Sequence, residues 1–339
     1  MSASDAPDLR PPVYRRHQIP GVVLVVAGAL LIGQLVNTGF GYGLLNSWLV
    51  LSVAGLGFYV VFGLGGQFAF SQAAFFGLGA YASVWASDGR SFGWGLLAAI
   101  VLSSLVAAAF GLLVRRSDQL YFAIATLALG YIAIVVFREF EAFTAPGGEI
   151  VGIPKPSLFG KVFDSDAEMA TFLTGALAIA LLLVALIERS PLRREALALR
   201  HGPTVAATLG VPTARLRLLA FVLGSAFAGA AGSLYAHRTG FISTETFSVV
   251  LAIDIFLLLL LGGMDSMWGP MLGAAFVVWA PEQLRFIGEY RNLVYGAVLV
   301  VVIVAFPKGL VGLAELVWAR RPAGRRATAL ASGGDDAAG

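Results

Sequence analysis

The sequence contains no cysteine, and its three histidines, His17, His201 and His237, lie far apart in the chain. Without cysteine there is no disulfide, no thiolate metal site and no cysteine nucleophile. The chain also lacks any G-x-x-x-x-G-K-[ST] motif, the loop that binds ATP phosphates in Walker-type proteins. The missing motif predicts a chain without an ATPase site of its own, and we expect no enzyme activity, no metal site and no cofactor.

Charged residues are also scarce. They make up 13% of the 339 residues, against roughly 25% in soluble domains, whereas hydrophobic residues make up 58%. A soluble fold cannot bury so much apolar surface, so we expect an all-α integral membrane protein in contact with lipid. The basic residues flank apolar segments, so the net charge of +3 indicates membrane orientation and not nucleic-acid binding.

The apolar segments divide the chain into about ten candidate transmembrane helices, because a membrane crossing requires about 20 apolar residues. These spans are predicted at residues 19–36, 46–63, 68–87, 93–114, 120–137, 168–187, 216–237, 247–263, 268–285 and 292–307. Together they form a transmembrane domain over residues 19–313. A short N-terminal segment, 1–18, precedes it, and a small, polar and basic tail, 314–339, follows it and is expected to be disordered.

Three of these segments allow a second interpretation. The first follows Arg15 and Arg16 and resembles a signal peptide, but it is longer than the usual apolar stretch of about 7 to 15 residues. We interpret it as a membrane anchor. The second and third are short and are separated by Gly63, Gly65 and Gly66, so they could instead form a broken or re-entrant hairpin. That alternative leaves every later loop on the same side of the membrane.

Lysine and arginine are concentrated in alternate loops. By the positive-inside rule, both termini and the loop 188–215 lie in the cytoplasm, and the loop 138–167 lies outside. The outer loop contains the turn-rich stretch PGGEIVGIP, residues 146–154, together with several acidic residues. It is a candidate docking surface, although an ordinary solvated loop has the same composition.

The inner loop contains two short helix patterns. SPLRREALALR, residues 190–200, places Pro191 in the first turn after Ser190 as a cap. PTVAATLG, residues 203–210, again begins with proline and ends with glycine. An isolated helix below about 12 residues is marginal, so the second helix requires support from the membrane bundle or from a partner. A plain surface helix that connects two spans is the alternative.

Five stretches, in this order, resemble the permeases of the high-affinity branched-chain amino acid ABC transporters, the LivM-type subunits. They cover most of residues 50 to 313. The stretches are GQFAFSQAAFFGLGAY (66–81), YFAIATLALG (121–130), AATLGVPTARLRLLAFVLGSAFAGAAGSLYAHRTGFIS (206–243), LLGGMDSMWGPMLGA (260–274) and FPKGLVGL (306–313).

The resemblance implies a type II-like importer bundle in the bacterial cytoplasmic (inner) membrane. It implies as partners ATP-binding ABC subunits, a second homologous permease subunit, an extracytoplasmic solute-binding protein and membrane lipid. It further implies that the short inner helix is the coupling helix, which seats in a groove of the ATPase subunit. Its apolar Val205, Ala206, Ala207 and Leu209 are expected to face that partner. The coupling helix comprises Pro203, Thr204, Val205, Ala206, Ala207, Thr208, Leu209 and Gly210.

Polar residues inside apolar spans are candidates for the translocation path, because a charge at the bilayer centre costs about 2.5 to 3.5 kcal/mol. Asp254 lies among apolar neighbours in its span, and the family tends to carry an acidic residue there. Gln67, Ser71 and Gln72 lie on a glycine-flanked segment, where many family members have Gly-His in place of Ser71 and Gln72. For Asp254, the alternative is that its side chain pairs with a donor inside the bundle. For Gln67, Ser71 and Gln72, the alternative is that they satisfy hydrogen bonds at a broken helix.

Small residues recur four apart on three helix faces, at Ser225 and Gly229, Ala228 and Gly232, and Gly269 and Gly273. Such faces allow close helix packing and can also slide during alternating access.

Two other classes of protein are considered. An ion-coupled secondary transporter would use Asp254 as its ion site. A membrane-embedded enzyme would require clustered titratable groups, and none is visible. The solute stays open between branched-chain amino acids, other amino acids, urea and small amides.

Overall fold

The computed structural model describes residues 38–312, apart from 89, 116, 145, 159, 202–205, 207, 209–210 and 306–308, together with residues 21, 25 and 27–29. The five described residues within the first predicted span are helical. The segment 1–18 and the tail 314–339 lie outside the described residues.

Helices account for most of the described chain. They are α2 (Gly39–Phe58), a π-helix η3 (Tyr59–Leu64), α3 (Gln72–Ser87), α4 (Phe92–Val114), α5 (Gln119–Glu139), α6 (Glu141–Thr144), α7 (Asp166–Arg189), α8 (Pro191–His201), α10 (Thr213–Thr239), α11 (Val249–Gly262), α12 (Gly269–Gln283) and α13 (Arg291–Ala305). Three short 3-10 turns, η4 (Pro146–Gly148), η5 (Thr244–Phe247) and η6 (Arg285–Tyr290), and four short strands complete it.

Each predicted span from 46 to 307 overlaps a helix, but these helices differ in length. Among the described residues, five are long and apolar enough to cross a membrane: Gly39–Gly63, Phe92–Val114, Gln119–Glu139, Asp166–Arg189 and Thr213–Thr239. The remaining apolar helices, α3, α11, α12 and α13, are shorter, and 14 to 16 residues reach only about 21 to 24 Å along a helix. The second predicted span is therefore long enough to cross, whereas the third, α3, is short.

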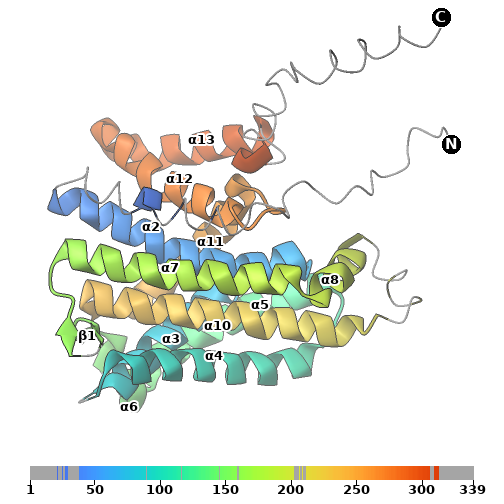
Figure 1. The fold of residues 1–339 in the computed structure, drawn as a ribbon, viewed down its shortest axis with the longest axis horizontal. Helices are drawn as coiled ribbons and strands as arrows, with labels where there is room; N and C mark the ends of the chain where they lie inside the picture. The colour runs from blue at the N-terminus through green and yellow to red at the C-terminus, as the bar shows by residue number, and fades with distance from the viewer. Residues whose placement is uncertain are drawn as a thin grey trace, which may run out of the picture.

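The long helices α4, α7 and α10 run in the same general direction across the molecule (Figure 1). Helix α10 packs against α2, α3 and α4, so it lies at the centre of the bundle. Helix α2 joins this group to a second one, because it also contacts α7, α11 and α12. Helix α13 lies beyond α12, on the side of the molecule away from α4 (Figure 1).

The two long loops lie at opposite ends of the bundle, with β1 and α6 at one end and α8 at the other (Figure 1). The loop that follows α5 is ordered by short strands. β1 (Ile150–Val151) pairs antiparallel with β4 (Phe241–Ile242), and β2 (Ser157–Leu158) pairs with β3 (Lys161–Val162). The loop is therefore attached directly to the end of α10.

Glycine determines how closely α10 approaches its neighbours. An added Cβ at Gly232 would overlap the carbonyl oxygen of Phe76 on α3, and one at Gly229 would lie 2.7 Å from the carbonyl oxygen of Ala99 on α4. In the same way, a Cβ at Gly273 on α12 would overlap the backbone of Leu258 on α11. The predicted small-residue faces are thus sites of backbone contact, where any side chain forces the helices apart.

Gly232→Leu is expected to lower the stability of the purified chain by about 1–3 kcal/mol or more, because the added side chain overpacks the contact between α10 and α3. The matched control is Gly175→Leu on α7, where an added Cβ meets no atom within 4 Å. Thermal unfolding in detergent measures both. Equal melting temperatures for the two variants would show that the glycine contact does not determine the helix spacing.

Candidate functional site

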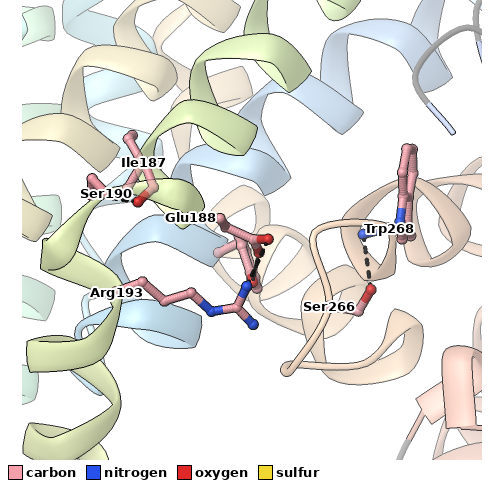
Figure 2. Close-up of polar contacts among 7 residues, drawn as sticks. Ile187, Glu188, Ser190, Arg193, Ser266 and Trp268 are labelled. Carbon is pink, nitrogen blue, oxygen red and sulfur yellow. Dashed lines mark hydrogen bonds and ion pairs between the residues drawn. The ribbon is translucent and has the colours of Figure 1, made fainter. Parts of the chain in front are cut away.

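The site lies at the end of the bundle that carries α8, where α7, η3 and α8 meet. Helix α7 ends at Arg189, and the Ser190 hydroxyl donates a 2.6 Å hydrogen bond to the Ile187 carbonyl oxygen. Pro191 then begins α8, as its place in the sequence predicted. A sharp turn between the two helices brings the last turn of α7 beside the first turn of α8 (Figure 2).

Glu188, in this last turn of α7, is the acceptor for two other elements. The Tyr59 hydroxyl, in the first position of η3, donates to its Oε1 at 2.5 Å. The Arg193 guanidinium of α8 donates to its Oε2 at 3.0 Å (Figure 2). We call these three side chains the Tyr59–Glu188–Arg193 cluster. It links α2 through η3, α7 and α8 at one point.

This cluster is largely removed from solvent, since the Glu188 side chain is 3% exposed and that of Arg193 is 15% exposed. A buried carboxylate is stable only where other groups neutralise its charge and occupy its lone pairs. Arg193 neutralises the charge of Glu188, and Arg193 and Tyr59 each donate a hydrogen bond to one of its carboxylate oxygens. Loss of any one member leaves a buried polar group with an incomplete set of partners.

The loop between α11 and α12 lies opposite the cluster, and Figure 2 shows its Ser266 and Trp268. The Trp268 backbone N–H donates to the Ser266 hydroxyl at 3.3 Å, which shapes the turn that leads into α12. A Cβ added at Gly63 of η3 would lie 2.8 Å from the carbonyl oxygen of Met264 in this loop. The π-helix η3 therefore contacts the α7–α8 junction through Tyr59 and the α11–α12 loop through Gly63.

The predicted coupling helix follows α8, and only Ala206 and Thr208 of it are described. Pro203, Thr204, Val205, Ala207, Leu209 and Gly210 lie outside the described residues. Both described residues are helical. Ala206 is 1% exposed, whereas Thr208 is exposed. The expectation that Ala206 faces a partner is therefore wrong, because its methyl group packs within this chain.

The break between η3 and α3, residues 65–71, carries the predicted polar residues Gln67 and Ser71, and Gln72 begins α3. All three are buried. The Gln67 Oε1, the Ser71 Oγ and both amide atoms of Gln72 have no hydrogen-bond partner among the described residues. The alternative that they satisfy hydrogen bonds at the break does not apply to these atoms.

Aromatic rings surround this break. Phe62 and Phe68 lie 4.5 Å apart between ring centroids, and Phe256 of α11 contacts Phe58, Phe68 and Phe70 at 5.7 to 6.3 Å. The rings connect the break to α11, which carries Asp254 two residues before Phe256.

Asp254 is half-buried, and no described residue donates a hydrogen bond to its carboxylate. Helix α11, which carries Asp254, contacts α13. The structure thus buries Gln67, Ser71 and Gln72 at the break. It places Asp254 on a different helix, beside α13.

Comparison with known proteins gives one consistent result. The family described as "Branched-chain amino acid transport system / permease component" matches residues 42–303. The chain belongs to this family. No solved structure matches the chain.

Individual relatives of this permease agree with the family. The High-affinity branched-chain amino acid transport system permease protein LivM of Salmonella typhimurium is 33% identical over 290 residues, which cover 77% of this chain and 68% of the relative. The corresponding LivH of Escherichia coli is 26% identical over 77% of this chain and 91% of the relative. The Autoinducer 2 import system permease protein LsrC of Klebsiella pneumoniae is 32% identical over 140 residues, or 38% of this chain and 41% of the relative.

At the opposite end of this permease, His237 attaches the loop 138–167 to the bundle. Its Nδ1 lies 2.8 Å from the Pro154 carbonyl oxygen, and its Nε2 lies 3.0 Å from the Ser83 hydroxyl, which contacts the Ser233 hydroxyl at 2.7 Å. Because a carbonyl oxygen only accepts, Nδ1 carries the hydrogen in this contact. The Tyr81 hydroxyl donates to the Gly148 carbonyl oxygen in the same loop. The candidate docking surface is therefore held in a defined position.

Sequence reasoning did not find Tyr59, Glu188 or His237 as site residues. Tyr59 and Glu188 are 129 positions apart, and no local spacing connects them. One signal was available for Glu188, because it is an acidic residue at the end of an apolar span, directly before a predicted helix start.

Proposed function

We propose that the chain is a transmembrane permease subunit of an ATP-driven ABC importer for branched-chain amino acids or related small amides. The observation that carries this proposal is the family match over residues 42–303, together with the similarity to LivM over 77% of the chain. The chain carries no Walker motif in its sequence, so the energy for transport comes from partner subunits.

The proposed topology has about ten crossings in a transmembrane domain at 19–313, with both termini in the cytoplasm of the bacterial inner membrane. In support of it, the outer loop 138–167 and the coupling loop 188–215 lie at opposite ends of the long helices (Figure 1). Exposed apolar side chains on α4, α5 and α7, among them Leu105, Tyr131 and Ile179, suit contact with lipid. Together with the first predicted span and the five long helices, the short helices α3, α11, α12 and α13 make up the proposed ten crossings.

The proposed partners are ATP-binding ABC subunits, a second homologous permease subunit and an extracytoplasmic solute-binding protein. The similarity to both LivM and LivH supports a second permease, since these are two permease proteins of one named transport system. The ATPase subunit contacts the coupling segment 203–210. The solute-binding protein docks on the outer loop that β1, β4 and His237 hold against α10.

Force from the coupling segment has a direct route into the bundle. The segment continues from α8, whose Ala196 and Leu199 are buried against the bundle. Arg193 of α8 binds Glu188 of α7, which binds Tyr59 of η3. The break at 65–71 follows η3 directly. A shift of α8 therefore reaches the break through an ion pair and a hydrogen bond.

We propose that the translocation path includes Gln67, Ser71 and Gln72 on this break, with Asp254 on the neighbouring α11. Buried polar atoms without partners are costly unless water or a solute satisfies them, and the break carries several such atoms. The contact between Phe70 and Phe256 joins the two parts of the path.

The experiment is uptake of radiolabelled leucine by proteoliposomes that contain the full complex with its solute-binding protein. Uptake is expected only when ATP is present on the side of the ATPase subunits. Liposomes that contain this chain alone, with a proton or sodium gradient and no ATP, are the control. Leucine accumulation in the control would overturn the proposal in favour of an ion-coupled transporter. ATP-driven uptake of an amide or of another amino acid but not of leucine would change the solute and leave the class unchanged.

A further inference from the structure

Two cavities flank Arg217 at the end of the bundle that carries α8. One, of about 140 Å³, is lined by residues of η3, the break, α5 and α8, among them Gly66, Gln119 and Leu199. The other, of about 10 Å³, lies between the α4–α5 turn and α10 and is lined in part by Gln67, Arg115 and Ser117. Arg217 lines both. The smaller cavity is about the size that one water requires, and the larger one accepts a small polar group.

Arg217 has no acceptor within the described part of the chain. Its Nε is buried, and none of its N–H groups donates to a described residue. A guanidinium has five N–H donors in a planar arrangement and stays charged, so a buried guanidinium nitrogen without an acceptor is costly. Arg115, which lines the smaller cavity, is exposed and likewise makes no hydrogen bond or ion pair with a described residue. Two cations thus border one cavity whose described lining includes no acidic residue.

Gln67 indicates that a ligand at this site must also offer an uncharged hydrogen-bond donor. It is 7% exposed, lines the smaller cavity, and its Oε1 has no donor among the described residues. The Ser117 side chain lies at the same cavity. A ligand that fits this site therefore combines an anion, for the two arginines, with hydroxyl donors, for the glutamine.

The surroundings of the site favour a lipid over a soluble anion. Helices α4 and α5 meet at the site, and both expose apolar side chains in the adjacent turns, among them Leu112, Leu113, Leu120, Tyr121 and Ile124. Leu113 is 81% exposed, two residues before Arg115. A phospholipid presents acyl chains to such a surface while its phosphate reaches the bases beside it. Basic pockets between transmembrane helices bind anionic head groups in this way.

We propose that Arg217 and Arg115 bind the phosphate of an anionic phospholipid with a hydroxylated head group, of the phosphatidylglycerol type. The two arginines donate to the phosphate oxygens, and a head-group hydroxyl donates to Gln67. The bound lipid contacts the α4–α5 turn, α10 and the break at 65–71, and its site borders Leu199 of α8. It stabilises the same junction that receives force from the coupling segment. Binding of the phosphate by Arg217 and Arg115 does not depend on the proposed transport function, whereas Gln67 is a residue that both proposals use.

The test uses the purified full-length chain in neutral detergent, analysed by native mass spectrometry. Phosphatidylglycerol and phosphatidylcholine are titrated separately, and a third series adds inorganic phosphate. Arg217→Gln and Arg115→Gln each remove hydrogen bonds from a charged donor, so each is expected to weaken phosphatidylglycerol binding by about tenfold or more. The matched control is Arg215→Gln, because Arg215 is exposed on the same helix and lines neither cavity.

We expect one phosphatidylglycerol per chain to bind in preference to phosphatidylcholine, and Arg215→Gln to retain it. Gln67→Leu is expected to weaken phosphatidylglycerol while it leaves phosphatidic acid, which lacks the hydroxylated head group, unchanged. Equal losses for Arg217→Gln and Arg215→Gln would overturn the proposal, because unspecific surface attraction depends only on charge. Phosphate binding that requires Arg217, without phosphatidylglycerol binding, would also overturn it and assign the site to a soluble anion. If the Arg217→Gln variant does not fold, the Arg115→Gln variant tests the proposal, because Arg115 is exposed and its replacement is not expected to disturb folding.

Discussion

Glu188→Ala is expected to lower the stability of the purified chain by about 3–5 kcal/mol, the usual cost when one member of a buried ion pair is removed. The substitution leaves the Tyr59 hydroxyl and the Arg193 guanidinium without their common acceptor. It also separates η3 from α8, so ATP-driven uptake is expected to fall further than stability alone explains. Thermal unfolding in detergent and uptake in proteoliposomes measure the two effects.

A double-mutant cycle isolates the ion pair within this prediction. Glu188→Ala, Arg193→Ala and the double variant are compared, and the coupling energy is expected to exceed about 1 kcal/mol. Arg194→Ala is the matched control, because Arg194 is exposed on the same turn of α8. Tyr59→Phe removes only the hydroxyl, at an expected cost of about 1.5–3 kcal/mol for a hydrogen bond to a charged group. Additive effects of Glu188→Ala and Arg193→Ala would contradict the assignment of the cluster as a link.

Thr208→Trp and Leu209→Asp are expected to separate ATP hydrolysis from transport. Thr208 is exposed, so a bulky side chain there changes the surface of the coupling segment without entering the core. Leu209 is an apolar residue of the segment by sequence, and a carboxylate there opposes seating in an apolar groove. In the reconstituted complex, leucine uptake is expected to fall by about tenfold or more, within the usual range of coupling free energies. ATP hydrolysis is expected to continue.

Ala206→Trp provides the contrast for this prediction. Ala206 is buried within the chain, so a large side chain there overpacks the bundle and lowers the melting temperature of the chain. Thr208→Trp is expected to leave that melting temperature within a few degrees of the wild type. Normal uptake by both Thr208→Trp and Leu209→Asp would show that residues 203–210 do not transmit the force, whichever family the chain belongs to.

Local patterns in the sequence predicted the helices well. Each predicted span from 46 to 307 overlaps a helix, and Ser190 and Pro191 marked the junction of α7 and α8, because apolar length and helix-end preferences act over a few residues. The membrane character follows from composition, and the family follows from stretches of similar sequence in one order. The small-residue pairs indicated the faces of α10 and α12 that pack closely.

Other features required the tertiary structure. Alanine suits a partner groove and the interior of its own chain equally well, so the sequence could not decide the direction of Ala206, and the expected direction was wrong. Helix length was overestimated for α3, α11 and α12, because apolar residues continue into the turns and breaks beside them. The sequence located the polar residues in the spans, but only the structure showed that Gln67, Ser71 and Gln72 are buried with polar atoms that have no partner among the described residues.

The sequence by itself determined that this protein lies in a membrane, where its helices run, and to which family it belongs, because each of these depends on residue type and local order. Only the tertiary structure decided that Glu188 joins Tyr59 to Arg193, and that Arg217 borders two cavities without an acceptor among the described residues. The physical reason is distance along the chain. Hydrogen bonds, ion pairs and cavities form between side chains that helix packing brings together, and no local pattern records which distant side chains will meet.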